Sequence, residues 1–351
     1  MSLPKPEVRA EADRLVALFE ATGAQRVEAD ILQPAEVLLD LYGEDIRARA
    51  YTTSDPLRGE QMLRPDFTVP VVQQHMAESA EPARYVYAGE VFRRQEEDAT
   101  RPAEYLQVGY EIFDRSSPVD VEAGLFALFH RALEGLSLSA VIGDIGFLVE
   151  GIAGLKTSEA RKAALARHIW RPARFMQLLD RFAAPARVTL AETKGPQIGL
   201  RRAAEVEARV AGLTLDAETP PLTSDEVTTL KSLLNVSAPA PEALEQLRAI
   251  AAQMDGLSGA VTRFEARLAA LDAQGIAPES LRFEGSYGRS QMEYYDGFVF
   301  GFVAADPDLP TVASGGRYDA LTRILGAGRD VPAVGGVIRP EIVSYLKGVR
   351  A

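Results

Sequence analysis

The segment Tyr105–Phe113 carries polar residues at a spacing that could bind a small ligand. Its alternating pattern predicts a strand, because successive side chains of a strand point to opposite faces of a sheet. One predicted face is apolar and belongs to the core: Leu106, Val108, Tyr110 and Ile112. The other face carries an amide and a carboxylate on either side of a glycine: Tyr105, Gln107, Gly109, Glu111 and Phe113. Glycine inside a strand is often found where a ligand or another backbone approaches closely, although a half-exposed sheet with polar residues facing water explains the same pattern.

A second group of candidate residues follows near the end of the chain. An alternating pattern over residues 292–303 predicts a strand in which Tyr295 shares its face with an acid and small residues: Glu293, Gly297, Val299 and Gly301. A tyrosine therefore faces glycines here too. The pair Gly315-Gly316 precedes Arg317, Tyr318 and Asp319, but such a pair also fits an ordinary loop.

The elements that must position these residues alternate between hairpins and helices. Apolar residues at helical spacing predict a packing helix from Glu7 to Ala21. Two short strands flank the turn at residues 54–56, a helix opens at Thr68, and another runs from Ser117 to Gly135. Hairpins with helices between them indicate an α+β fold with a mainly antiparallel sheet rather than a doubly wound fold.

The middle of the chain has a different character. From Gly151 to Gln274 it is rich in Ala, Leu, Glu and Arg and is broken by prolines, which indicates a helical insert. Basic residues at Arg161–Arg174 and Arg201-Arg202 alternate with alanine. We interpret them as solvated helix faces without an assigned function.

Composition limits the possible functions. The chain has 351 residues, enough for two units, and a net charge of −12, which disfavours unguided attraction to nucleic-acid phosphates. Cysteine is absent, so neither disulfides nor thiolate chemistry are available, and the three scattered histidines do not suggest a metal site. No apolar run approaches the roughly 18 residues that span a bilayer. We therefore expect a cytoplasmic protein that does not bind membranes.

Five segments together resemble, in order, the signature motifs of the histidyl-tRNA synthetase catalytic domain. They are LRPDFT (63–68), FRRQEEDATRPAEYLQVGYE (92–111), MEYYDGFVF (292–300), GGRYDALTRILG (315–326) and PAVGGVIRPE (332–341). The resemblance implies a class II synthetase core, with a mainly antiparallel six-stranded sheet flanked by helices, and a dimer. It divides the chain into residues 1–143 (first part of the core), 144–279 (a mainly helical insert) and 280–351 (second part of the core).

The resemblance also implies a retained histidine pocket. Asp66 stands where the family has an acid for the substrate ammonium, with Thr68 and Gln107 beside it. Glu111 and Tyr295 stand where the family grips the imidazole, and Tyr318 is the tyrosine of the GGRYD motif. These side-chain types suit histidine, since its ammonium needs hydrogen-bond acceptors and its neutral imidazole needs one donor and one acceptor.

The departures from the family pattern concern the adenylation step. Ser290 replaces an arginine, and Arg289 is one residue away, which in a strand means the opposite face. Ile342 replaces the arginine expected to stack on adenine. The loop Gln95–Asp98 carries the acids Glu96, Glu97 and Asp98, which would repel phosphates. Arg93 and Arg101 remain at family positions and could contact a phosphate or a carboxylate.

Only ten residues follow Glu341, so we expect no anticodon-binding domain and no tRNA partner. A histidine pocket without adenylation machinery resembles the regulatory subunits of ATP phosphoribosyltransferase. This implies no catalytic residues, no cofactor and no metal. It also implies a hetero-oligomer with the short-form catalytic subunit, in which histidine inhibits the first step of histidine biosynthesis. Two alternatives stay open: a truncated ligase that adenylates histidine for a non-tRNA acceptor, and a free-standing amino-acid-binding module.

Overall fold

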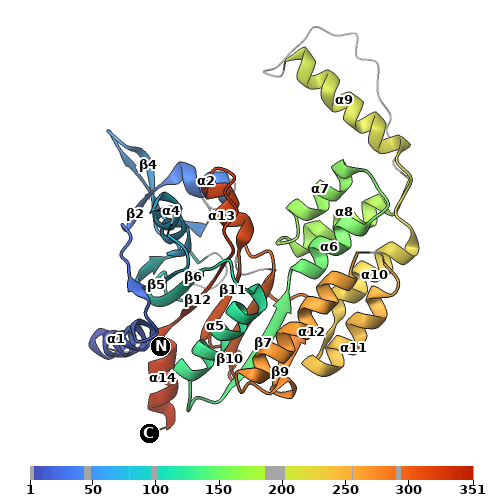
Figure 1. Ribbon diagram of the computed structural model, residues 1–351. Coiled ribbons are helices and arrows are strands. Elements are labelled where there is room, and N and C mark those ends of the chain that lie inside the picture. The colour runs from blue at the N-terminus through green and yellow to red at the C-terminus, as the bar shows by residue number, and fades with distance from the viewer. Residues whose placement is uncertain are drawn as a thin grey trace.

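The computed structural model describes residues 4–42, 49–78, 80–95, 101–185, 202–254, 256–289 and 294–350. Within them, a mixed nine-stranded sheet forms the centre of the molecule (Figure 1). In spatial order its strands are β1 (Gln25–Arg26), β5 (Ala83–Phe92), β6 (Glu104–Phe113), β12 (Ala333–Ile338), β11 (Ala313–Arg317), β10 (Phe298–Ala304), β7 (Leu138–Asp144), β9 (Leu281–Glu284) and β8 (Ser237–Pro239).

The expected α+β architecture is confirmed, but the predicted number of six strands is wrong. The six strands from β5 to β7 do pair antiparallel. The sheet is extended by β1, which pairs parallel to β5, and by β9, which pairs parallel to β7 and antiparallel to β8. These added strands have two to four residues each, too few to produce an alternating pattern in the sequence.

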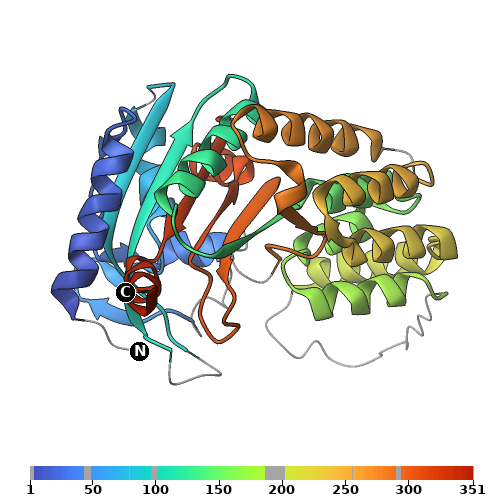
Figure 2. The same cartoon turned by 90° about the horizontal axis from the view of Figure 1, so that it is seen from below.

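A small antiparallel sheet lies beside the large one, in the order β2 (Leu32–Pro34), β4 (Gly59–Leu63) and β3 (Thr52–Asp55). Six helices accompany the two sheets among the described residues. They are α1 (Lys5–Glu20), α2 (Ala35–Tyr42), α4 (Thr68–Glu78), α5 (Pro118–Ala132), α13 (Asp319–Leu325) and α14 (Pro340–Arg350). The predicted packing helix is α1, whose apolar residues are buried against β5, β6 and α14 (Figure 2).

Both faces of β6 are buried. Tyr110, on the predicted core face, packs edge-on against Phe19 of α1 with ring centroids 5.1 Å apart. Gln107 and Glu111, on the opposite face, are each only 1% exposed. The interpretation of this strand as half exposed to water is therefore wrong, because α4 and the residues before it cover the polar face.

The segment between β7 and β9 forms most of the right-hand side of the molecule as seen in Figure 1. Its helices are α6 (Gly146–Gly154), α7 (Glu159–Arg167), α8 (Pro172–Phe182), α9 (Ala203–Glu218), α10 (Ser224–Asn235), α11 (Ala240–Ala251) and α12 (Ser258–Ala273), with a 3-10 turn at Pro278–Ser280. Helix α9 projects away from the rest (Figure 1). In the part of the chain that is described, no helix has both the length and the apolar composition needed to cross a membrane.

One basic residue of this segment is not the solvated side chain that its sequence suggested. Arg161 of α7 is 2% exposed, and its Nε donates a hydrogen bond of 2.6 Å to Asp216 of α9. Further donations reach the backbone oxygens of Asp216 and Pro220. Arg161 thus anchors the end of α9, and burial is possible because all three guanidinium nitrogens donate to acceptors.

A buried ion network joins α12 to the central sheet. Arg267 of α12 donates to Glu122 of α5 at 2.6 Å and to Asp144 of β7 at 2.8 Å. Arg317 of β11 donates to the other carboxylate oxygen of Glu122. The two arginines hold the pKa of Glu122 below its usual value despite its burial, so the network is charged and pins α12 onto α5.

Candidate functional site

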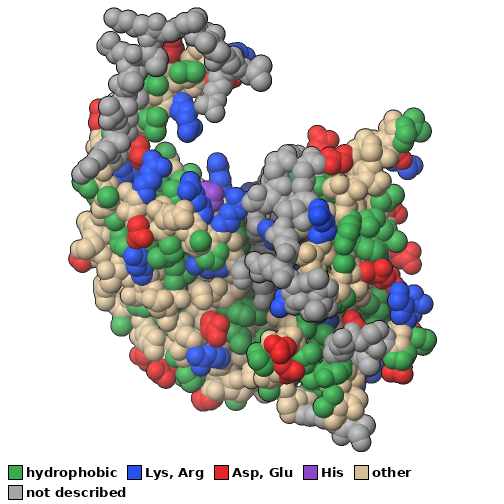
Figure 3. Space-filling model, turned by 180° about the vertical axis from the view of Figure 1, so that it is seen from behind, with side chains coloured by type: hydrophobic (Ala, Val, Ile, Leu, Met, Phe, Trp, Pro, Cys, Tyr) green, Lys and Arg blue, Asp and Glu red, His purple; other side chains and the backbone are tan. Residues whose placement is uncertain are grey.

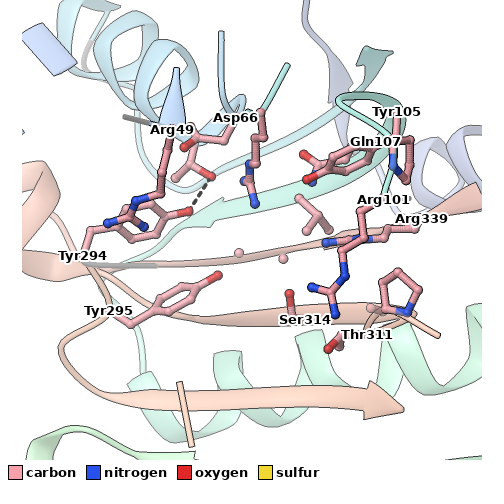
Figure 4. A pocket seen from close by; sticks show the side chains of 18 of the residues that line it. Arg49, Asp66, Arg101, Tyr105, Gln107, Tyr294, Tyr295, Thr311, Ser314 and Arg339 are labelled. Carbon is pink, nitrogen blue, oxygen red and sulfur yellow. Dashed lines mark hydrogen bonds between the residues drawn. The ribbon is translucent and has the colours of Figure 1, made fainter. Parts of the chain in front are cut away.

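A cavity of about 610 Å³ opens beside the polar face of β6. Its size lies within the range of pockets that hold small molecules. Seven of the residues proposed from the sequence line it: Asp66, Thr68, Arg93, Arg101, Gln107, Tyr295 and Tyr318. Figure 4 shows the side chains of Asp66, Gln107, Tyr295 and Arg101 around a shared space. The eighth, Glu111, lies beneath the lining.

Two side chains give the cavity hydrogen-bond acceptors, Asp66 and Gln107. Asp66 precedes α4, and its Oδ1 accepts from the backbone N–H of Val69 at 3.4 Å, which orients the carboxylate at the helix N-terminus. The carbonyl oxygen of Gln107 is buried, and no donor reaches it from the residues that the structure describes. Because buried acceptors are nearly always satisfied in native proteins, this oxygen and the Asp66 carboxylate indicate a place for a cationic or N–H-bearing ligand.

Glu111 organises the hydroxyl groups around the cavity instead of lining it. Its carboxylate accepts from Thr68 Oγ1 at 3.0 Å, from Tyr87 Oη at 2.9 Å and from Tyr318 Oη at 2.5 Å. Burial raises the pKa of Glu111 to about 7, although the three hydroxyl donors act in the opposite direction. Burial also raises the pKa of Tyr318, and the neighbouring carboxylate reinforces this shift. The Tyr318 hydroxyl is therefore neutral, donates to Glu111 and offers its lone pairs to a ligand.

Gly109 of β6 serves a close approach by the protein itself. A Cβ atom added at Gly109 would lie 2.1 Å from Cζ of Tyr87, which is directly opposite in the β5–β6 register. The Tyr87 ring fills this space and stacks on Phe67 with centroids 4.5 Å apart. A ligand therefore does not approach the strand at Gly109. The glycine instead makes room for Tyr87, whose hydroxyl donates to Glu111.

Tyr295 reaches the cavity from a loop and not from a strand. The predicted strand over 292–303 is wrong at its start, since β10 begins at Phe298, and Glu293 lies outside the described residues. The Tyr295 ring lies over Gly316, where an added Cβ atom would be 2.8 Å from Cδ1 of Tyr295. The prediction that Tyr295 faces Gly297 and Gly301 is wrong, because added Cβ atoms there would meet the side chains of Arg317 and Tyr287, and the glycine under Tyr295 belongs to β11.

Five arginines are among the residues that line the cavity: Arg49, Arg93, Arg94, Arg101 and Arg339. Arg93 donates to the backbone oxygen of Pro65 at 2.8 Å, and Arg339 lies 4.7 Å from the centroid of the Tyr105 ring. Burial lowers the pKa of Arg339, and the positive charges of Arg93 and Arg101 lower it further. Mutual repulsion among these cations favours a bound anion.

The sequence did not identify Arg49, Arg94 or Arg339 as cavity residues: Arg49 and Arg339 are far in the chain from Arg93, and Arg94 directly follows it. A partial signal exists in the paired arginines after β5.

Seen from behind, Lys and Arg side chains gather where the molecule is hollowed below α9 (Figure 3).

Of the described positions that depart from the adenylation pattern, Gln95 lines the cavity, whereas Ile342 and the neighbour of Ser290, Arg289, do not. Ile342 is 4% exposed within α14 and is not among the lining residues. Arg289 donates from Nε to the backbone oxygen of Ile169 at 2.8 Å, so it points to the insert and does not replace a cavity arginine. Ser290, Glu96, Glu97 and Asp98 lie outside the described residues.

The histidines have separate environments. His75 is buried, stacks on Phe113 with centroids 3.9 Å apart and pairs with the Tyr85 hydroxyl at 3.1 Å. His130 is exposed on α5, and His168 is half-buried after α7. Among the described residues, no group of three or more His, Cys, Asp or Glu side chains could hold a metal ion.

Comparison with known proteins defines the class of the fold. The family model described as histidyl-tRNA synthetase matches residues 5–343. The crystal structure of an ATP phosphoribosyltransferase regulatory subunit/histidyl-tRNA synthetase from Bacillus halodurans superposes with a TM-score of 0.72 at 19% identity, covering 99% of this chain and 81% of that chain. Histidyl-tRNA synthetase from Nostoc sp. PCC 7120 gives a TM-score of 0.65 at 16% identity, covering 100% and 73%. The fold is that of the class II aminoacyl-tRNA synthetases.

Curated relatives identify the branch within this class. The ATP phosphoribosyltransferase regulatory subunit of Mesorhizobium japonicum is 32% identical over 366 aligned positions, covering 96% of this chain and 97% of the relative. That of Agrobacterium fabrum is 31% identical, covering 96% of both. The chain belongs to the family of ATP phosphoribosyltransferase regulatory subunits.

Proposed function

We propose that this chain regulates ATP phosphoribosyltransferase by binding free histidine in the cavity beside β6. As a member of its family, the chain is a non-catalytic regulatory subunit that acts in histidine biosynthesis. The observation that carries the proposal is the buried, unsatisfied carbonyl oxygen of Gln107 beside Asp66 in a cavity that also contains tyrosine hydroxyls and arginines.

In the proposed binding mode, the three parts of histidine meet complementary groups. The ammonium lies between Asp66, Gln107 and the lone pairs of Thr68. The imidazole lies between the hydroxyls of Tyr295 and Tyr318, where one hydroxyl donates to the unprotonated nitrogen and the other accepts from the N–H group.

The remaining charges fit the same arrangement. Glu111 fixes the orientation of the Tyr318 hydroxyl from behind, at 2.5 Å. The ligand carboxylate faces Arg93 or Arg101, which line the cavity. A phosphate contact by these two residues is the alternative use of the same charges.

Inhibition by histidine depends on the linkage between histidine binding and the equilibrium of the active and inhibited transferase assemblies. Histidine can shift the transferase assembly only if it binds the inhibited form more tightly than the active form. We propose that the catalytic partner is the short-form transferase, and that this chain joins it as a dimer within a hetero-oligomer without tRNA.

The cavity arginines are also the feature that a ligase adenylating histidine, the alternative expected from the sequence, would use. A triphosphate would be attracted by Arg93, Arg101 and the other arginines that line the cavity. ATP–pyrophosphate exchange that depends on histidine separates the two functions, because a regulatory subunit shows none. A free-standing amino-acid-binding module would bind histidine in calorimetry but would not co-purify with a short-form transferase.

The direct test is reconstitution with a short-form transferase, with activity measured at increasing histidine concentration. Asp66→Asn should raise the histidine concentration for half-inhibition about 10- to 100-fold, because a charged hydrogen bond is lost. The complex should still assemble. Asp13→Asn, at an exposed position of α1, is the matched control and should not change inhibition. Equal inhibition of wild type and Asp66→Asn would show that histidine acts elsewhere.

A further inference from the structure

A short turn of the insert, between α7 and α8, contacts the loop that carries Tyr295. The indole Nε1 of Trp170 donates to the backbone oxygen of Tyr295 at 3.2 Å. The neighbouring backbone oxygen of Ile169 accepts from Arg289 Nε at 2.8 Å. Consecutive residues of the insert thus bind the chain both before and after residues 290–293.

We propose that Trp170 is a positioning residue for Tyr295, and that it couples the insert to the amino-acid pocket. The proposal rests on histidine binding in this cavity. It gives the insert a role: the turn sets how tightly the pocket holds histidine, and pocket occupancy changes the insert in return.

The turn is well supported from the insert side. Ile169 is 1% exposed. The Arg289 guanidinium lies 4.9 Å from the centroid of the Phe175 ring of α8, and Phe175 is fully buried. The backbone oxygen of Ile169 and the adjacent indole of Trp170 therefore lie on a turn that is held by packing as well as by hydrogen bonds.

Tyr295 is held from the core side at the following residue. The backbone N–H of Asp296 donates to the oxygen of Arg317 at 3.0 Å. The carboxylate of Asp296 accepts from the backbone N–H groups of Asp319 at 3.1 Å and of Ala320 at 2.6 Å, at the start of α13. The loop is therefore anchored to the core at Asp296 and to the insert at Tyr295.

These two anchors place the pocket tyrosine between two parts of the molecule. A ligand that engages the Tyr295 hydroxyl acts on a residue whose carbonyl group belongs to a hydrogen bond with the insert. Because linkage is reciprocal, a partner that shifts the insert must change histidine affinity by the same factor as histidine changes the affinity for that partner.

Trp170 is also the single tryptophan of the chain, so tryptophan emission reports the environment of this one side chain. Titration of the full-length wild-type chain with L-histidine should change the tryptophan emission with the same midpoint as the calorimetric binding curve. Histidine binding in calorimetry with no change in emission would overturn the coupling while leaving histidine binding itself intact. No calorimetric binding to the wild type would overturn both proposals.

The variant Trp170→Phe keeps an aromatic ring but removes the N–H donor. Its histidine affinity should fall about five-fold, the effect of one lost hydrogen bond. Tyr110→Phe is the matched control, since it removes a hydroxyl paired with Thr22 at 2.7 Å on the opposite face of β6. The control should keep wild-type affinity even if it lowers the melting temperature. Unchanged affinity in Trp170→Phe, or an equal loss in Tyr110→Phe, would overturn the positioning role.

Discussion

The carboxylate of Glu111 should make the stability of the chain depend on pH in a direction opposite to that of an acid whose pKa is lowered on folding, such as the ion-paired Glu122. Burial raises the pKa of Glu111 from 4.5 to about 7. Between these values the folded chain binds the proton more tightly than the unfolded chain. The stabilisation is therefore fully present below pH 4.5 and is lost as the pH rises towards 7.

The size of the effect follows from the pKa difference. At about 1.4 kcal/mol per pH unit, a change from 4.5 to about 7 corresponds to about 3 kcal/mol in the free energy of unfolding. Between about pH 5 and about pH 7.5 roughly two-thirds of this appears, or about 2 kcal/mol, because the unfolded carboxyl already titrates in part at the lower pH.

The assay compares wild type with Glu111→Gln by urea unfolding at these two pH values. Glutamine does not ionise, so the stability of wild type relative to the variant should fall by about 2 kcal/mol as the pH rises. Asp296, whose pKa burial also raises to about 7, contributes equally to both chains and cancels. Glu134→Gln, at an exposed position, is the control and should show a difference independent of pH. A constant difference between wild type and Glu111→Gln would refute the buried, hydroxyl-bound carboxylate.

Three further substitutions test separate parts of the structure. Ile342→Arg should show no ATP–pyrophosphate exchange with histidine, since residue 342 is buried in α14 away from the cavity lining; measurable exchange would contradict the loss of several adenylation groups. Arg267→Met should lower the free energy of unfolding by about 3–5 kcal/mol in urea titrations, because Glu122 loses a buried partner; a loss below about 1 kcal/mol would contradict that role. Gly109→Ala should cost about 1–3 kcal/mol by overpacking against Tyr87, and an unchanged unfolding midpoint would contradict the close approach.

The strand that carries Gln107 and Glu111 could be predicted because its period of two is strong. The role of Gly109 could not be predicted, because it depends on the register that places Tyr87 opposite the glycine. The sequence of a single strand does not determine its register. The same reason explains Glu111: the sequence shows a carboxylate facing the ligand side, but not that Tyr87 and Tyr318 would occupy its oxygens.

The arginines that line the cavity were predictable only in part. Arg93 and Arg101 belong to one motif and Arg339 to another, whereas Arg49 reaches the same space from outside the five motifs. Similarly, nothing in the helical pattern of the insert indicates that Trp170 lies against Tyr295. Contacts between distant segments depend on tertiary packing, which neither propensity nor spacing encodes.

The most direct test of histidine binding is a crystal structure of the chain grown with L-histidine. The account predicts one histidine in the cavity beside β6, with its ammonium next to Asp66 and Gln107 and its imidazole next to the Tyr295 hydroxyl. A cavity without histidine at saturating concentration, or histidine bound at another place on the chain, would contradict it.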